Sequence, residues 1–156
     1  MQTELEIQRA TTLTSTPSDE QFQHWVNAVP SDLNQTVQLS IRIVDEPEAQ
    51  RFNCDYRNRD YATNVLSFPA DLPEGLPAEV RRSQIGDLLI CAPVVVREAL
   101  ERRRPEADHW AHLTIHGVLH LLGYDHEKDA EAFIMESMET EILKTLGVPD
   151  PYLEKT

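Results

Sequence analysis

Three histidines, His116, His120 and His126, gather within eleven residues of the chain. His116 and His120 are four apart, so on one helix their rings face the same side, with Cβ atoms about 5–6 Å apart. Gly123 suits the end of that helix because glycine enters the left-handed conformation freely, and the following turn brings His126 back. Three imidazoles leave a fourth tetrahedral position for water, which is typical of catalytic zinc sites. We therefore expect these three side chains to bind one metal ion.

The residue after the first of these histidines limits the reactions that the metal site could catalyse. The spacing H-x3-H-x2-G-x2-H equals that of the metzincin proteases, which carry a glutamate general base directly after the first histidine. Gly117 stands at that position here, and glycine has no carboxylate to accept a proton. The pattern keeps the metal site and disfavours peptide hydrolysis.

Other polar residues near this cluster are further candidates. Asp125 either orients an imidazole or exchanges protons, or it is a turn residue that bonds the local backbone, and both interpretations stay open. His112, one turn before His116, is expected behind the ligands or partly exposed, because a fourth protein ligand would close the site. His109 and His24 are expected at the surface.

Two residues farther upstream lie where they could meet a substrate. Arg57, in the stretch CDYRNRDYATNVLSFP, has a planar guanidinium that suits phosphate. Ser67 ends a predicted strand, where a buried hydroxyl bonded to the backbone is favoured over a catalytic role.

Hydrophobic periodicity predicts the elements that must position these residues. Strands are expected over 3–8, 36–44, 64–68 and 85–91, and helices from the cap at Ser18 to Pro30, over 47–54, 93–104, 106–122 and 127–146. The last helix is expected to bury one stripe and to end at Gly147. The residues of that stripe are Ala130, Phe133, Ile134, Met138, Ile142 and Leu146. Residues 70–83, which contain two prolines and a glycine and follow Pro69, are expected to form a loop. Two strands then follow one another without a helix, which favours an α+β fold with a small mixed sheet.

Size and charge limit the remaining possibilities. The 156 residues fit one domain, 1–156, and the two cysteines form no redox or disulfide motif. The first residues have no basic and apolar leader pattern, and no apolar run reaches the roughly 20 residues that span a bilayer, so we expect a cytoplasmic protein. The net charge of −13 is uneven, because residues 51–104 hold nine of the fourteen lysines and arginines. An arginine-bearing middle inside an acidic shell suits a few phosphates at a defined site.

Three stretches of the sequence match a known family. The stretch HGVLHLLGYDH, together with YRNRDYATNVLSFP and GDLLIC, closely resembles the YbeY endoribonucleases over roughly residues 36 to 152. The resemblance implies a mixed four-stranded sheet flanked by helices, with the metal at one end of a cleft. It also implies that His116, His120 and His126 are the metal ligands and that Arg57 faces the cleft. Ala62 replaces a proline that the family motif often has, which changes only local backbone stiffness.

The resemblance further implies a single-strand-specific, metal-dependent endoribonuclease that acts in maturation of the 16S rRNA 3′ end and in ribosome quality control. Zinc is the expected ion, although imidazole also suits nickel, copper and iron. The expected partners are single-stranded RNA, 16S rRNA and the small ribosomal subunit with its proteins, without membrane or DNA.

In the expected mechanism, the metal that His116 helps to hold binds a phosphoryl oxygen or activates water, and Arg57 stabilises the charge that develops on the phosphate. The nucleophile is either water or the 2′-OH of the substrate. Two alternatives remain. One is a ribosome-assembly factor with a structural metal, and the other is a metallopeptidase-like hydrolase.

Overall fold

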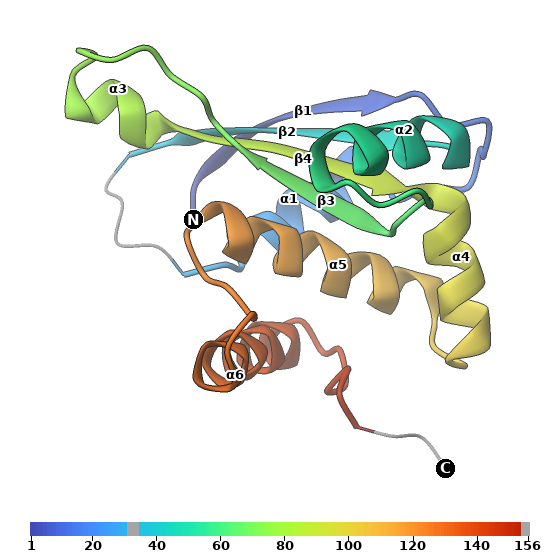
Figure 1. The fold of residues 1–156 in the computed structure, drawn as a ribbon. Coiled ribbons are helices and arrows are strands. Elements are labelled where there is room, and N and C mark those ends of the chain that lie inside the picture. The colour runs from blue at the N-terminus through green and yellow to red at the C-terminus, as the bar shows by residue number, and fades with distance from the viewer. Residues whose placement is uncertain (31–34, 154–156) are drawn as a thin grey trace.

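The computed structural model describes residues 1–30 and 35–153 (Figure 1). The strands are β1 (Thr3–Arg9), β2 (Val37–Val44), β3 (Val65–Pro69) and β4 (Gln84–Cys91). The helices are α1 (Asp19–Asn27), α2 (Glu46–Arg57), α3 (Ala78–Ser83), α4 (Ala92–Glu101), α5 (Glu106–Leu121) and α6 (Asp129–Thr145). Among the described residues, no helix has both the length and the apolar character needed to cross a membrane.

The four strands form one mixed sheet in the order β1-β2-β4-β3. β1, β2 and β4 run parallel, and β3 pairs antiparallel with β4 at the edge. The connection between β3 and β4 contains the short helix α3. The predicted α+β fold with a four-stranded mixed sheet is confirmed.

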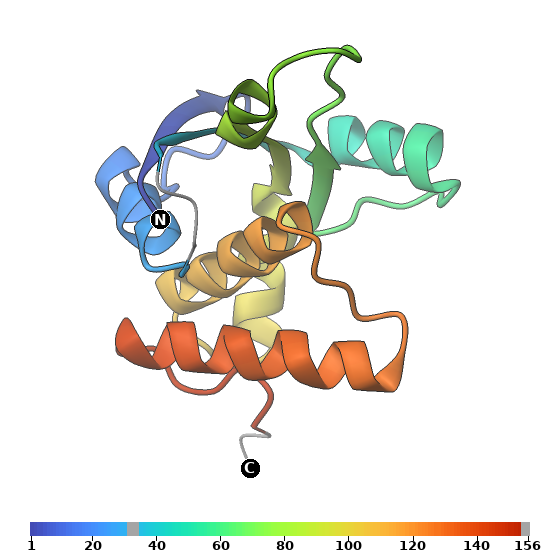
Figure 2. The same cartoon turned by 90° about the vertical axis from the view of Figure 1, so that its left-hand side faces the viewer.

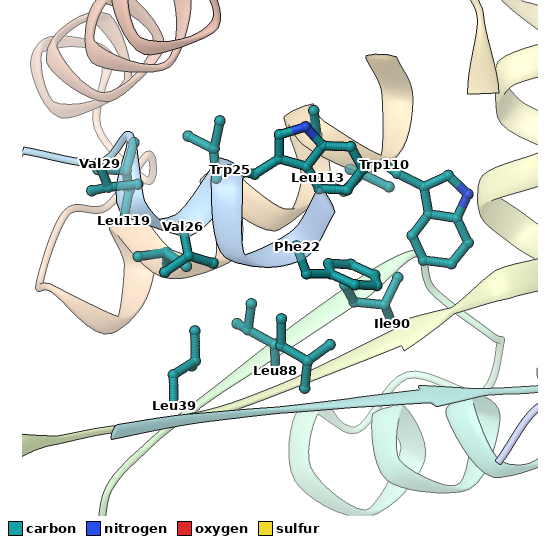
Figure 3. Packing of buried hydrophobic residues seen from close by; sticks show 14 of the residues in the cluster. Phe22, Trp25, Val26, Val29, Leu39, Leu88, Ile90, Trp110, Leu113 and Leu119 are labelled. Atoms are coloured by element: carbon teal, nitrogen blue, oxygen red, sulfur yellow. The ribbon is translucent and has the colours of Figure 1, made fainter. Parts of the chain in front are cut away.

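The two faces of the sheet are covered by different helices. Leu88 and Ile90 of β4 pack into a large core with α1 and α5, in which Phe22 lies edge-on to Trp110 at 6.0 Å between ring centroids (Figure 3). Leu89, between them in the strand, points the other way into a smaller cluster that includes α2. Because successive side chains of a strand alternate between faces, the almost continuous apolar run of β4 is buried on both sides. Figure 2 shows α5 and α6 stacked in turn below the sheet.

The buried face of α6 differs from the predicted one. Phe133 and Ile134 are 71% and 53% exposed, whereas Ile142 is buried as expected. The stripe that faces α5 contains the carboxylate of Glu139, with Met135 one turn before it. A glutamate is normally assigned to the solvent side of a helix. The predicted buried stripe was therefore placed on a face of α6 that excludes Glu139, whereas the face that is buried includes it.

The helices α3 and α2 also differ from the prediction. α3 lies inside the predicted loop 70–83, where the proline and glycine content hid one short helix. α2 continues beyond Cys54 to Arg57, and Asn58 ends it in the left-handed conformation with φ of 55°. The capping box of α1 is as predicted, since the Gln21 backbone N–H donates to Ser18 Oγ at 3.2 Å and the reciprocal bond is present.

Gly117 is the point at which α5 approaches the sheet closely. A Cβ at this position would lie 2.7 Å from Cδ2 of Leu88 and 3.3 Å from Oγ of Ser67. Leu88 is 1% exposed, so its side chain is confined by the core. The absence of a side chain at Gly117 is therefore a packing requirement, and a glutamate there would be driven into β3 and β4 instead of toward the metal site.

We predict that Gly117→Ala lowers the free energy of unfolding by about 1 kcal/mol. Overpacking costs about 1–3 kcal/mol, and the better helix propensity of alanine offsets about 1 kcal/mol of it. Urea unfolding measures the change. In a Leu88→Val background, which removes the contacting methyl group, the same substitution is expected to be neutral or stabilising. An equal loss in both backgrounds would show that the close contact is not the cause.

Candidate metal centre and cleft

The last turn of α5 and the loop after it bring three imidazoles together. The ring centroids lie 4.7 Å apart for His116 and His120, 4.9 Å for His120 and His126, and 5.4 Å for His116 and His126. One ring nitrogen from each lies within 4.8 Å of the others. The turn follows the predicted route, because Gly123 has φ of 102° and its N–H donates to the His120 carbonyl.

The donor set fits one transition-metal ion. Burial, together with the charges of His116 and His126, lowers the pKa of His120 to about 4. The ring of His120 is therefore neutral at pH 7, which is the form that coordinates a metal. Three ring nitrogens at this separation suit a tetrahedral ion with one position left for water or substrate.

Glu139 of α6 contacts His116 of the three-histidine cluster, and the sequence pattern did not predict this contact. Its Oε1 accepts a hydrogen bond from Nδ1 of His116 at 2.5 Å. A ring that donates from Nδ1 presents the Nε2 lone pair, and carboxylates behind metal-binding histidines commonly set this tautomer. The signal in the sequence was a glutamate between Met135 and Ile142 on the apolar side of a helix.

The Glu139 carboxylate is fully buried and accepts from three side chains. Nε2 of His112 donates to Oε2 at 3.0 Å, and the Tyr152 hydroxyl donates to the same oxygen. Burial alone would raise the pKa of Glu139, but the hydrogen bonds from His112, His116 and Tyr152 outweigh it and hold that pKa at about 2. Glu139 is therefore an anion at neutral pH, directly behind the three-histidine cluster.

The other histidines of α5 belong to a buried polar network. The prediction that His109 is exposed was wrong, since its side chain is 0% exposed and its Nε2 bonds Glu98 at 3.0 Å. Nη1 of Arg104 donates to Nδ1 of His109 at 3.3 Å and to Nδ1 of His112 at 3.5 Å. Because arginine can only donate, Nδ1 of each ring is the acceptor in these contacts, and Nε2 is the atom that donates to the glutamate. His112 lies behind the ligands as expected, and His24 is exposed on α1 as predicted.

A cleft of about 600 Å³ opens in front of the three histidines. One wall is the unpaired edge of β3, and the rim includes Arg57, which is exposed at the end of α2. Ser67 lines the cleft, but its hydroxyl donates to the Gly117 carbonyl at 3.0 Å, so the backbone-bonded interpretation is confirmed. Asp125 also lines it and accepts the His126 backbone N–H at 2.7 Å, which confirms its turn role and leaves its proton role a prediction.

Comparison with known proteins identifies the family. The family model described as Endoribonuclease YbeY matches residues 4–147. The chain belongs to the endoribonuclease YbeY family. Two relatives named Endoribonuclease YbeY support the assignment. The protein from Halorhodospira halophila (strain DSM 244 / SL1) is 56% identical over 141 residues, which are 90% of this chain and 91% of the relative. The protein from Xanthomonas axonopodis pv. citri (strain 306) is 55% identical over 136 residues, which are 87% of this chain and 84% of the relative.

A solved structure shares the fold. The solution structure of TM1509 from Thermotoga maritima superposes with a TM-score of 0.59, covering 89% of this chain and 87% of that protein. Its sequence identity to this chain is 24%, so the likeness concerns the fold. The YbeY family is a family of enzymes, and the cleft with its three histidines is the candidate site of their chemistry in this member.

We predict that Glu139→Gln weakens metal binding about 10- to 100-fold, because an amide accepts the His116 proton less strongly than a carboxylate. Titration of zinc into the metal-free protein, in competition with a chelating dye, measures the affinity. The matched control is Glu136→Gln, which removes an exposed carboxylate from the same helix. Equal affinities for the two variants would contradict the role given to Glu139.

Proposed function

We propose that this protein is a metal-dependent endoribonuclease of one domain that cleaves single-stranded RNA in the cytoplasm. The observation that carries the proposal is the cluster of His116, His120 and His126 in the lining of a cleft, in a chain of the YbeY family. The proposed cellular role is maturation of the 16S rRNA 3′ end and ribosome quality control, with the small subunit and its proteins as partners.

The three histidines would hold the metal, for which zinc is proposed. When bound, the ion would act as a Lewis acid toward a phosphoryl oxygen and lower the pKa of water to about 7. His116 belongs to the three-histidine cluster, and its Nδ1 donates to Glu139. We assign His116 a catalytic role on this basis.

Arg57 is the other proposed catalytic residue of the cleft. Its side chain is exposed and lines the cleft, and within the described residues it makes no ion pair with an acid. A guanidinium free of carboxylate partners can bind two phosphate oxygens at once and stabilise charge that develops on them during cleavage.

The charge of the whole molecule supports selective rather than general RNA binding. The chain has 27 acidic residues against 14 lysines and arginines. Tight non-specific binding to RNA comes from many lysine or arginine contacts to phosphate, and an acidic surface opposes it. The substrate is therefore expected to be held at the cleft and by ribosomal proteins.

Cleavage of single-stranded RNA by the zinc-loaded protein, and loss of cleavage after chelation, test the function.

We predict that His126→Ala abolishes cleavage while circular dichroism and the unfolding temperature stay near those of the unsubstituted protein, because His126 is exposed in a turn. A structural metal would give the reverse, with RNA cleavage retained and stability lost. Peptide cleavage without RNA cleavage would support a metallopeptidase instead.

We predict that Arg57→Gln lowers kcat/KM for RNA about 100-fold, since loss of one donor to a developing charge typically costs this factor or more. Arg57→Lys is expected to recover only part, because an ammonium lacks the planar fork. Steady-state kinetics measure the change. The control is Arg102→Gln, which removes one exposed arginine outside the cleft lining. A similar effect of both substitutions would indicate a general charge effect.

A further inference from the structure

The loop between α2 and β3 places two more residues on the rim of the cleft. Arg59 and Tyr61 line it together with Arg57, and Tyr61 is 51% exposed. Among the residues that the structure describes, Arg59, like Arg57, makes no ion pair with a carboxylate, although the chain has almost twice as many acids as lysines and arginines. Two arginines left without acidic partners beside the metal centre favour an anionic ligand.

The backbone that carries Tyr61 is held in place by α2. Nδ2 of Asn53 donates to the Tyr61 carbonyl at 2.8 Å, and Asn53 itself is 2% exposed. The Arg59 backbone N–H donates to the Asn53 carbonyl at 3.2 Å, so one buried residue anchors both ends of this segment. Gln50 adds a bond from its Nε2 to Asp60 at 2.9 Å. The half-exposed ring is thus presented by a fixed backbone, which reduces the entropy lost when a ligand packs on it.

An aromatic face beside free guanidinium groups is the combination that binds single-stranded nucleic acid. Bases stack on the ring, and arginines bind the phosphates on either side. The bases of a duplex are already stacked and paired, so their faces cannot reach such a ring without unstacking. The arrangement therefore discriminates between single and double strands.

We propose that Arg59 and Tyr61 form a nucleotide subsite next to the metal centre, in which an unpaired base stacks on Tyr61 and Arg59 binds an adjoining phosphate. The proposal rests on the proposed function and deepens it, since it names the residues that select single strands. It extends the site beyond the three histidines and Arg57 to the loop 58–64.

Steady-state cleavage of one defined single-stranded RNA by the zinc-loaded protein tests the subsite. Tyr61→Ala is expected to raise KM about tenfold, the loss typical of one stacked base, and Tyr61→Phe is expected to restore it. Arg59→Gln is expected to raise KM and to reduce the salt dependence of binding by about one phosphate contact, whereas Arg102→Gln should do neither. Unchanged unfolding temperatures of the variants separate these effects from loss of fold. Unchanged KM in Tyr61→Ala would overturn the proposal.

Substrates that lack one base provide the decisive comparison. The base is removed at successive positions around the cleaved bond, and each RNA is tested with the unsubstituted protein and with Tyr61→Ala. At one position the loss of the base and the loss of the ring are expected to be non-additive, because each removes the same contact. Additive losses at every position would overturn the subsite alone. Absence of RNA cleavage by the unsubstituted protein would overturn the proposed function, and the subsite with it.

Discussion

The hydrogen bond from His116 to Glu139 is the interaction on which the rest of the site depends. It joins α5 to α6, fixes which nitrogen of His116 faces the other two imidazoles, and places an anion behind the cluster. A buried carboxylate without partners would cost several kcal/mol, so His112 and Tyr152 must donate to it as well. The orientation of α6 follows from this requirement, since the helix turns Glu139 inward and leaves Phe133 exposed.

A second constraint acts on the other side of α5. α5 lies against β3 and β4 at Gly117, where the space for a Cβ is already filled by Leu88. The Ser67 hydroxyl bonds the Gly117 carbonyl and ties the edge strand to the helix. The distance between the histidines and the wall of the cleft is therefore set by core packing. Gly117 also stands at the position where a metzincin has its glutamate general base. Close packing and the absence of that base therefore have the same origin, a residue without a side chain.

Around this rigid centre, the buried histidines of α5 are bonded to charged partners, whereas two arginines that line the cleft are not. Arg104 contacts both His109 and His112, and His109 also bonds Glu98. Arg57 and Arg59, in contrast, have no acidic partner within the described part of the chain. Arginines without acidic partners at one cleft of an acidic protein favour an anionic ligand at that place, which suits a member of the endoribonuclease YbeY family.

The sequence by itself determined the mixed α+β fold, most element boundaries and the grouping of His116, His120 and His126. These features depend on local rules, because helix periodicity puts residues four apart on one side and Gly123 turns the chain back. Tertiary structure alone decided that Glu139 points inward, that His109 is buried and that Gly117 faces Leu88. Each of these features depends on a partner from a distant segment of the chain. Hydrophobic periodicity describes one helix or strand at a time, so it cannot show that a charged side chain has a hydrogen-bond partner in the core.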